Sequence, residues 1–84
     1  MEFKNPEDTT EDLVESVREI KRAAFHLLKL SWGTRIRLYR SGLYSEPDPI
    51  AKLIDSIIWR SGESEMEARE LIRRIEEAEN IGKE

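Results

Sequence analysis

The sequence predicts a single all-α domain with three main helices, at about 10–31, 49–60 and 64–79. Three observations support this fold class. Apolar residues recur at three- and four-residue steps, which is the spacing of one helix face. Residues that commonly cap helices precede these stretches. The chain has 84 residues, which is enough for only one domain, and we place that domain at 1–84.

The first predicted helix, 10–31, follows a polar stretch, 1–8, that we expect to be frayed. Thr9 and Asp12 have the spacing of a capping box, in which the threonine hydroxyl accepts a hydrogen bond from a free backbone N–H. Acidic residues crowd the first turn, where they complement the helix dipole. The expected buried face has apolar residues at helical spacing, namely Leu13, Val17, Ile20, Ala24, Leu27 and Leu28.

The second predicted helix, 49–60, has clear start and stop signals. Asp48 is a candidate N-cap, and Pro49 occupies the first helical position, where the missing N–H of proline does no harm. Gly62 is a natural C-terminal stop, because glycine readily adopts the conformation that ends helices. The apolar stripe of this helix consists of Ile50, Leu53, Ile54, Ile57 and Ile58.

The third predicted helix, 64–79, begins at Ser64 and Glu67, which have the spacing of a second capping box. Because only residues 61–63 would connect it to the second helix, we expect these two helices to form a C-terminal hairpin. The tail, 80–84, is expected to fray. The inward residues of the third helix would be Ala68, Leu71, Ile72, Ile75 and Ala78.

A basic connector, 32–47, has two open interpretations. With a period of two, Ile36 and Leu38 face one side of a short strand. With a helical period, Ile36 and Tyr39 share a face, and the segment would continue the first helix across Gly33. A lone strand has no partner within this chain, so the strand interpretation requires a second subunit.

Charge is divided unevenly along the chain, whose formal net charge is −4. Residues 21–44 contain six Lys or Arg and no acid, whereas acids outnumber bases in 1–20 and in 45–84. Basic side chains neutralise phosphates, and aromatic rings can stack on exposed nucleic-acid bases. The candidate nucleic-acid-binding residues of this acid-free segment are Lys21, Arg22, Lys29, Arg35, Arg37, Tyr39 and Arg40.

The sequence therefore predicts a small non-enzymatic protein that binds DNA or RNA, or acts as a regulator, through segment 21–44 and assembles as a homodimer. The alternative is a helical protein–protein interaction or adaptor module that self-associates, or binds an acidic protein partner, and does not bind nucleic acid. Dimerisation through the first helix would cover the apolar surface that a short hairpin leaves exposed.

One arrangement resembles the ribbon–helix–helix family. The sequence TRIRLYR is followed by a predicted helix, then by SGES and a further helix, over residues 34–79. The resemblance implies a dimer in which the strands of two chains pair. In this chain an extra N-terminal helix would precede each strand, where the family usually has little or nothing. It also implies that Arg35, Arg37 and Tyr39 read the major groove and that Ser64 contacts a phosphate.

Several other classes of function lack support in the sequence. The chain has no cysteine and one histidine, His26, and we recognise no catalytic constellation, metal site or cofactor site. No apolar run approaches the roughly 20 residues of a membrane-spanning helix. The acidic N-terminus is unlike a signal peptide, so we expect a cytoplasmic protein. Many charged residues and few thermolabile ones give the chain a thermophile-like composition.

Overall fold

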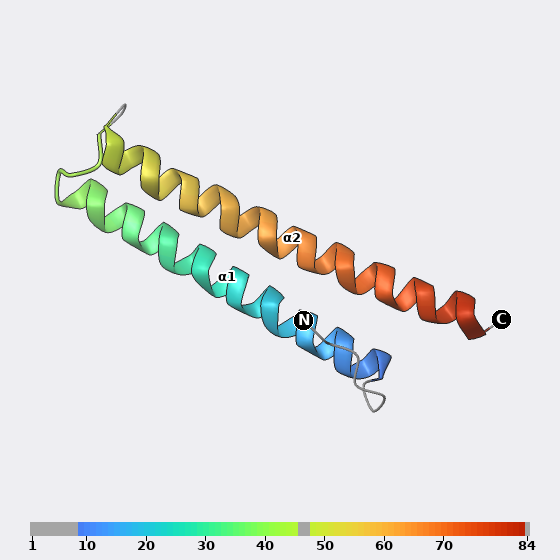
Figure 1. Cartoon of the computed structure of the whole chain (residues 1–84). Coiled ribbons are helices and arrows are strands. Elements are labelled where there is room, and N and C mark those ends of the chain that lie inside the picture. The colour runs from blue at the N-terminus through green and yellow to red at the C-terminus, as the bar shows by residue number, and fades with distance from the viewer. Residues whose placement is uncertain (1–8, 46–47, 84) are drawn as a thin grey trace, which may run out of the picture.

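The computed structural model describes residues 9–45 and 48–83, which fold into two long helices joined by a turn (Figure 1). Helix α1 spans Thr10–Arg40 and helix α2 spans Pro49–Lys83. The helices lie side by side and run in opposite directions, so the start of α1 lies near the end of α2 (Figure 1). The molecule is a rod-shaped helical hairpin with extents of 58 × 22 × 20 Å.

The prediction of three main helices is wrong, because the second and third predicted helices form the single helix α2. Gly62, the expected stop, and Ser64, the expected cap of the next helix, both lie inside α2. Among the described residues, only Gly42 has the positive φ typical of helix-ending glycines. A glycine costs a helix about 1 kcal/mol relative to alanine. The burial of Ser61 and Glu65 against α1, on either side of Gly62, favours an uninterrupted helix.

The basic connector is mostly helix. Residues 32–40 continue α1 across Gly33, and the described part of the chain contains no strand. This finding overturns the strand interpretation and, with it, the ribbon–helix–helix-like dimer. The alternation of Ile36 and Leu38 is too short to specify a strand by itself. Because Arg35 and Leu38 are both partly covered by α2, packing selects the helical period.

The two helices meet along a seam whose positions follow alternating steps of three and four residues. This is the heptad spacing of coiled coils, with an average period of 3.5 residues. The seam consists of Thr10, Val14, Val17, Lys21, Ala24, Leu28, Ser31, Arg35 and Leu38 from α1, and of Ala51, Ile54, Ile58, Ser61, Glu65, Ala68, Ile72, Ile75 and Glu79 from α2.

The centre of this seam is small and partly polar. Ser31 and Ser61 are among its most buried residues, and both hydroxyls donate hydrogen bonds to the carbonyl four residues earlier in their own helix. Ala51 and Ala68 are also buried and contribute little apolar area. No large side chain among the described residues is completely buried. The larger aliphatic seam residues Leu28, Leu38, Ile58, Ile72 and Ile75 are only partly covered, so the hairpin hides their apolar surface incompletely.

Two of the three predicted helix starts are confirmed, those of α1 and α2. The Thr9 hydroxyl accepts a 3.2 Å hydrogen bond from the Asp12 N–H, and the Asp12 carboxylate accepts one of 3.2 Å from the Thr9 N–H. At the start of α2, the Asp48 carboxylate accepts a 2.8 Å hydrogen bond from the Ile50 N–H, and Pro49 occupies the first helical position. These caps satisfy N–H groups that have no partner inside a helix.

The turn after α1 depends on Gly42. Its φ of 81° lies in the left-handed region, and its N–H donates to the Tyr39 carbonyl at 3.1 Å. The N–H groups of Leu43 and Tyr44 both donate to the Leu38 carbonyl, at 2.9 and 3.1 Å. These bonds satisfy carbonyls at the helix end and direct the chain back toward α2.

Replacing Gly62 with alanine is expected to stabilise the protein by roughly 0.5–1 kcal/mol, because α2 is continuous at this position. A methyl group at Gly62 would meet no atom within 4 Å. Urea unfolding at one fixed protein concentration would measure the change. The matched control, Gly42→Ala, is expected to destabilise, since alanine disfavours a φ of 81°. A loss of stability in Gly62→Ala would contradict an uninterrupted α2.

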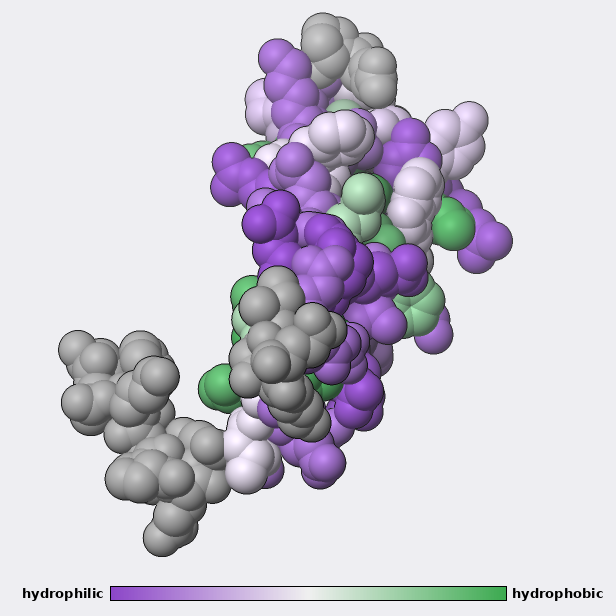
Figure 2. All heavy atoms as spheres, turned by 90° about the vertical axis from the view of Figure 1, so that its right-hand side faces the viewer, coloured by the Kyte–Doolittle hydropathy of each residue, from purple (hydrophilic) through white to green (hydrophobic). Residues whose placement is uncertain are grey.

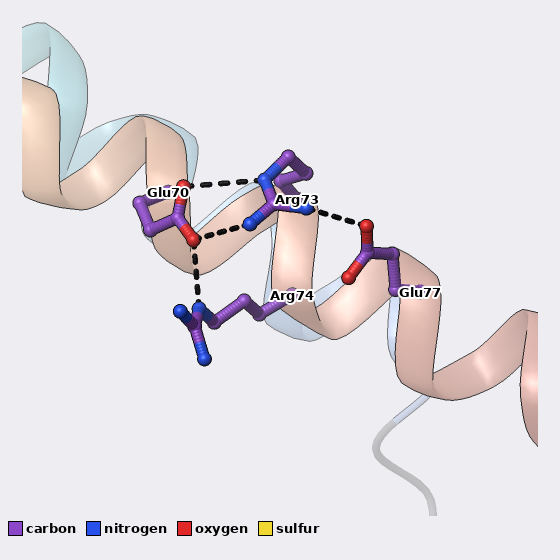
Figure 3. Close-up of polar contacts among 4 residues, drawn as sticks. All are labelled: Glu70, Arg73, Arg74 and Glu77. Carbon is purple, nitrogen blue, oxygen red and sulfur yellow. Dashed lines mark hydrogen bonds and ion pairs between the residues drawn. The ribbon is translucent and has the colours of Figure 1, made fainter.

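Charged side chains form a network on the outer surface of α2 (Figure 3). Glu70 accepts hydrogen bonds from Arg73 and Arg74, and Arg73 also donates to Glu77. The hydrogen bond from Arg73 and then that from Arg74 lower the pKa of Glu70 from 4.5 to about 2. All four side chains are at least partly exposed to solvent, so the network is screened and stabilises the helix only modestly.

The lowered pKa of Glu70 predicts a pH dependence of stability. The hydrogen bonds to the Glu70 carboxylate contribute to the free energy of unfolding above pH 4.5. This contribution is lost as the pH falls toward about 2, because protonation then removes the charge that both arginines bind. Between these pH values, the Tm of the wild-type protein should fall slightly more than that of Glu70→Gln. Thermal unfolding followed by circular dichroism would measure both falls. Equal falls would show that the Glu70 contacts do not contribute.

Candidate functional site

The seven residues predicted to bind nucleic acid do not share one face of the hairpin. Residues two positions apart on a helix point about 200° apart. Arg35 accordingly lies in the seam, while Arg37 lies on the exposed surface. Arg37 and Arg40 are exposed and form no ion pair with any described residue. The seven residues, all in α1, are Lys21, Arg22, Lys29, Arg35, Arg37, Tyr39 and Arg40.

Arg35 is held in a cluster that joins α1, the turn and α2. Its Nε donates to Asp55 Oδ1 at 3.1 Å, and its Nη2 donates to the Tyr44 hydroxyl at 3.0 Å. That hydroxyl donates to Asp55 Oδ2 at 2.7 Å, and its hydrogen bond to Asp55 raises the pKa of Tyr44. The guanidinium also lies over the rings of Tyr44 and Trp32, 4.6 and 5.3 Å from their centroids. Arg35 therefore links α1 to the turn and to α2 and stabilises the end of the hairpin where the chain reverses.

Two more of the predicted residues interact with neighbours on α1. Arg22 Nη1 lies 3.4 Å from a carboxylate oxygen of Glu15 and 3.8 Å from one of Glu19. Lys29 Nζ lies 5.5 Å from the centroid of the Phe25 ring. These contacts are exposed and weak, so they leave both cations accessible.

A more continuous feature is an apolar face on one flank of the seam. Its six residues each directly precede a seam residue in sequence, so within each helix they recur at multiples of seven and lie along one side. Each remains between 39% and 54% exposed. We use the name apolar face for Leu13, Ile20, Leu27, Ile50, Ile57 and Leu71.

The apolar face is hollowed along the boundary between the helices. Two shallow hollows of about 430 and 220 Å³ share Ile20 and Ser64, so they adjoin one another. Leu27 and Ile57 line the larger hollow, and Leu71 lines the smaller one. The hollows provide space into which side chains of another helix could insert.

The end of the rod has a different surface. Figure 2 views the molecule from the end where α1 begins and α2 finishes. Hydrophilic residues cover most of this end, and hydrophobic residues emerge between them in patches (Figure 2).

Sequence analysis did not separate the apolar face from the core. It placed Leu13, Ile20 and Leu27 on the same buried face as Val17 and Ala24, yet only the last two are buried in the hairpin. A heptad register alone does not separate the two sets, because Leu13, Val17, Ile20, Ala24 and Leu27 themselves follow alternating steps of four and three residues. The helical period of 3.6 residues likewise places the apolar-face residues and the seam residues on one side of α1. Only the packing against α2 leaves Leu13, Ile20 and Leu27 beside the seam.

The described residues include no group of three or more His, Asp or Glu placed to hold a metal ion. Within the described residues, neither helix has a stretch apolar and long enough to span a lipid bilayer. Comparisons with protein-family models, curated proteins and solved structures found no match to this chain.

Proposed function

We propose that this protein is a helical protein–protein interaction module that self-associates as a homodimer through its apolar face. Two hairpins would pack face to face, and the product would be a four-helix bundle. The observation that carries the proposal is the distribution of apolar side chains: six large aliphatic residues are half-exposed, while the seam is small and partly polar.

The energetics favour covering this face. Complete burial of a large aliphatic side chain contributes about 1.5–3 kcal/mol. Because the hairpin already hides about half of each side chain, roughly 0.7–1.5 kcal/mol per residue remains to be gained in a complex. The same six residues occur in both subunits of a homodimer, so the gain is doubled.

The charged residues beside the apolar face favour a second copy of this chain as the partner that covers it. Arg60 lines the larger hollow and Glu67 lines the smaller one, and both are on α2. In a two-fold symmetric dimer with antiparallel α2 helices, Arg60 of each subunit would approach Glu67 of the other. This surface is therefore self-complementary in charge as well as apolar.

A nucleic-acid-binding surface made of the seven predicted residues has less support. Arg35 is bound by Asp55 and Tyr44, and Arg22 lies beside glutamates. Arg37 and Arg40 are accessible, but they point away from Arg35, so the cations do not form one continuous patch.

The proposed function is tested by measuring molar mass with light scattering over a dilution series. We expect about twice the chain mass of 9.9 kDa at high concentration and dissociation on dilution. The same samples would be titrated with duplex DNA and single-stranded RNA across a salt series. A monomer at every concentration would contradict the proposal. Tight binding that falls steeply with salt would favour the nucleic-acid function instead.

A further inference from the structure

A second groove lies on the opposite flank of the seam from the apolar face. It contains two hollows of about 340 and 180 Å³ that share Lys21, Arg22 and Arg69. Arg18 and Ile72 also line the first hollow, and Phe25 and Glu65 also line the second. We use the name basic-aromatic groove for Arg18, Lys21, Arg22, Phe25 and Arg69.

The groove concentrates positive charge from both helices. Lys21 is a partly covered seam residue, and it forms no ion pair with the residues that the structure describes. Arg18 and Arg22 each lie 3.4 Å from Glu15, which is a long contact that leaves most of their N–H donors open to solvent. Phe25, which lines the second hollow with Lys21, Arg22 and Arg69, is 50% exposed.

Two other acids lie in or near the groove: Glu65, which lines it, and Glu19, which lies beside it. The carboxylate of Glu65 is mostly buried and accepts a 2.7 Å hydrogen bond from Arg69 Nε, which leaves the two Nη groups of Arg69 available. Glu19 is exposed and lies 3.8 Å from Arg22. The groove thus offers Lys21 and the remaining N–H groups of three paired arginines beside an aromatic ring.

We propose that the basic-aromatic groove binds an acidic amphipathic helix of a partner protein. Carboxylates of that helix would accept hydrogen bonds from Lys21 and the arginines, and an apolar side chain would pack on Phe25. This inference goes beyond the proposed homodimer and does not depend on it, because the two interactions use opposite flanks of the hairpin.

The dimensions of the groove match such a helix. Along α1, the positions of Arg18, Arg22 and Phe25 rise by about 10 Å, or two turns. An amphipathic helix lying along the groove presents one side chain per turn at the same spacing. Glu65 lines the groove and Glu15 and Glu19 lie beside it, and they would repel phosphates and partner carboxylates alike, so acidic groups of a partner must reach Lys21 and the outer N–H groups of the arginines.

The test is fluorescence anisotropy with a labelled synthetic peptide of about three heptads, with leucine at positions a and d and glutamate at e and g. We expect the full-length chain to bind it with an affinity that falls as salt rises. The double variant Arg18→Ala/Arg22→Ala should bind at least tenfold more weakly, on the order expected for lost charge pairs. The control, Arg37→Ala/Arg40→Ala, removes the same charge from α1 outside the groove and should bind like the wild type.

Absence of peptide binding, or an equal loss in both double variants, would overturn the proposal. Tighter binding of a single-stranded RNA that is lost in Arg18→Ala/Arg22→Ala would show a nucleic-acid site instead. Circular dichroism would establish that both variants remain helical, and the single variant Arg22→Gln would replace the double variant if that did not fold. Light scattering separates this proposal from the homodimer: a fall in mass caused by Arg18→Ala/Arg22→Ala would mean that a second copy occupies the groove.

Discussion

Replacing Leu27 with glutamate is expected to weaken self-association by about 100-fold or more. Leu27 is 48% exposed in the hairpin, so about half of the roughly 1.5–3 kcal/mol of its burial would be gained only in the dimer. Because the change occurs in both subunits, the lost area alone costs about 1.5–3 kcal/mol, or roughly 10- to 100-fold in Kd. Burying a carboxylate without a partner adds to this cost. Sedimentation or light scattering over a dilution series would measure the shift.

The matched control for this variant is His26→Glu. His26 is the adjacent, exposed residue and belongs neither to the seam nor to the apolar face, so it introduces the same carboxylate elsewhere on the helix. The control should leave the dimer Kd within about threefold, since an exposed rim charge changes affinity little. Dissociation of both variants, or of neither, would show that the apolar face is not the dimer interface.

Replacing Ile54 with alanine is expected to destabilise the hairpin by about 2–4 kcal/mol. Ile54 is a seam residue and is only 8% exposed, so its truncation removes apolar contacts and leaves a cavity between the helices. Since Val14, Val17 and Ile54 are the only branched aliphatic residues of the described seam that are buried, this loss is a large fraction of the total stability. Urea unfolding at fixed protein concentration would give the difference in free energy of unfolding.

Leu53→Ala provides the comparison, because Leu53 is adjacent to Ile54 and 67% exposed. We expect a loss below about 1 kcal/mol, as for other surface truncations. The difference between the two variants tests the register of α2 against α1. A larger loss in Leu53→Ala would mean that α2 is rotated and that the heptad seam has been assigned to the wrong residues.

Local interactions made some features predictable from sequence. The starts of both helices follow from Thr9 with Asp12 and from Asp48 with Pro49, because a cap involves only residues within one turn of each other. The helical character of both segments follows from their apolar spacing. These signals require no knowledge of the rest of the chain.

The candidate site was much less predictable. The basic composition of residues 21–44 was evident, but whether those cations shared a face depended on where the helix continued. Once 32–40 proved helical, Arg35 faced Asp55 on α2 and Arg37 did not. The apolar face could not be identified from the sequence, because leucines and isoleucines beside the seam have the same residue type and helical spacing as those within it.

The sequence by itself determined that this protein is helical, where α1 and α2 begin, and that its charges are segregated, although the capping signal at Ser64 marks no helix start. The tertiary structure alone decided that α2 continues through Gly62, that α1 continues to Arg40, and which apolar residues remain exposed. The physical reason is the range of the interactions. A cap is decided within four residues, whereas the end of a helix and its buried face depend on packing against a segment 20 or more residues away, as between Arg35 and Asp55.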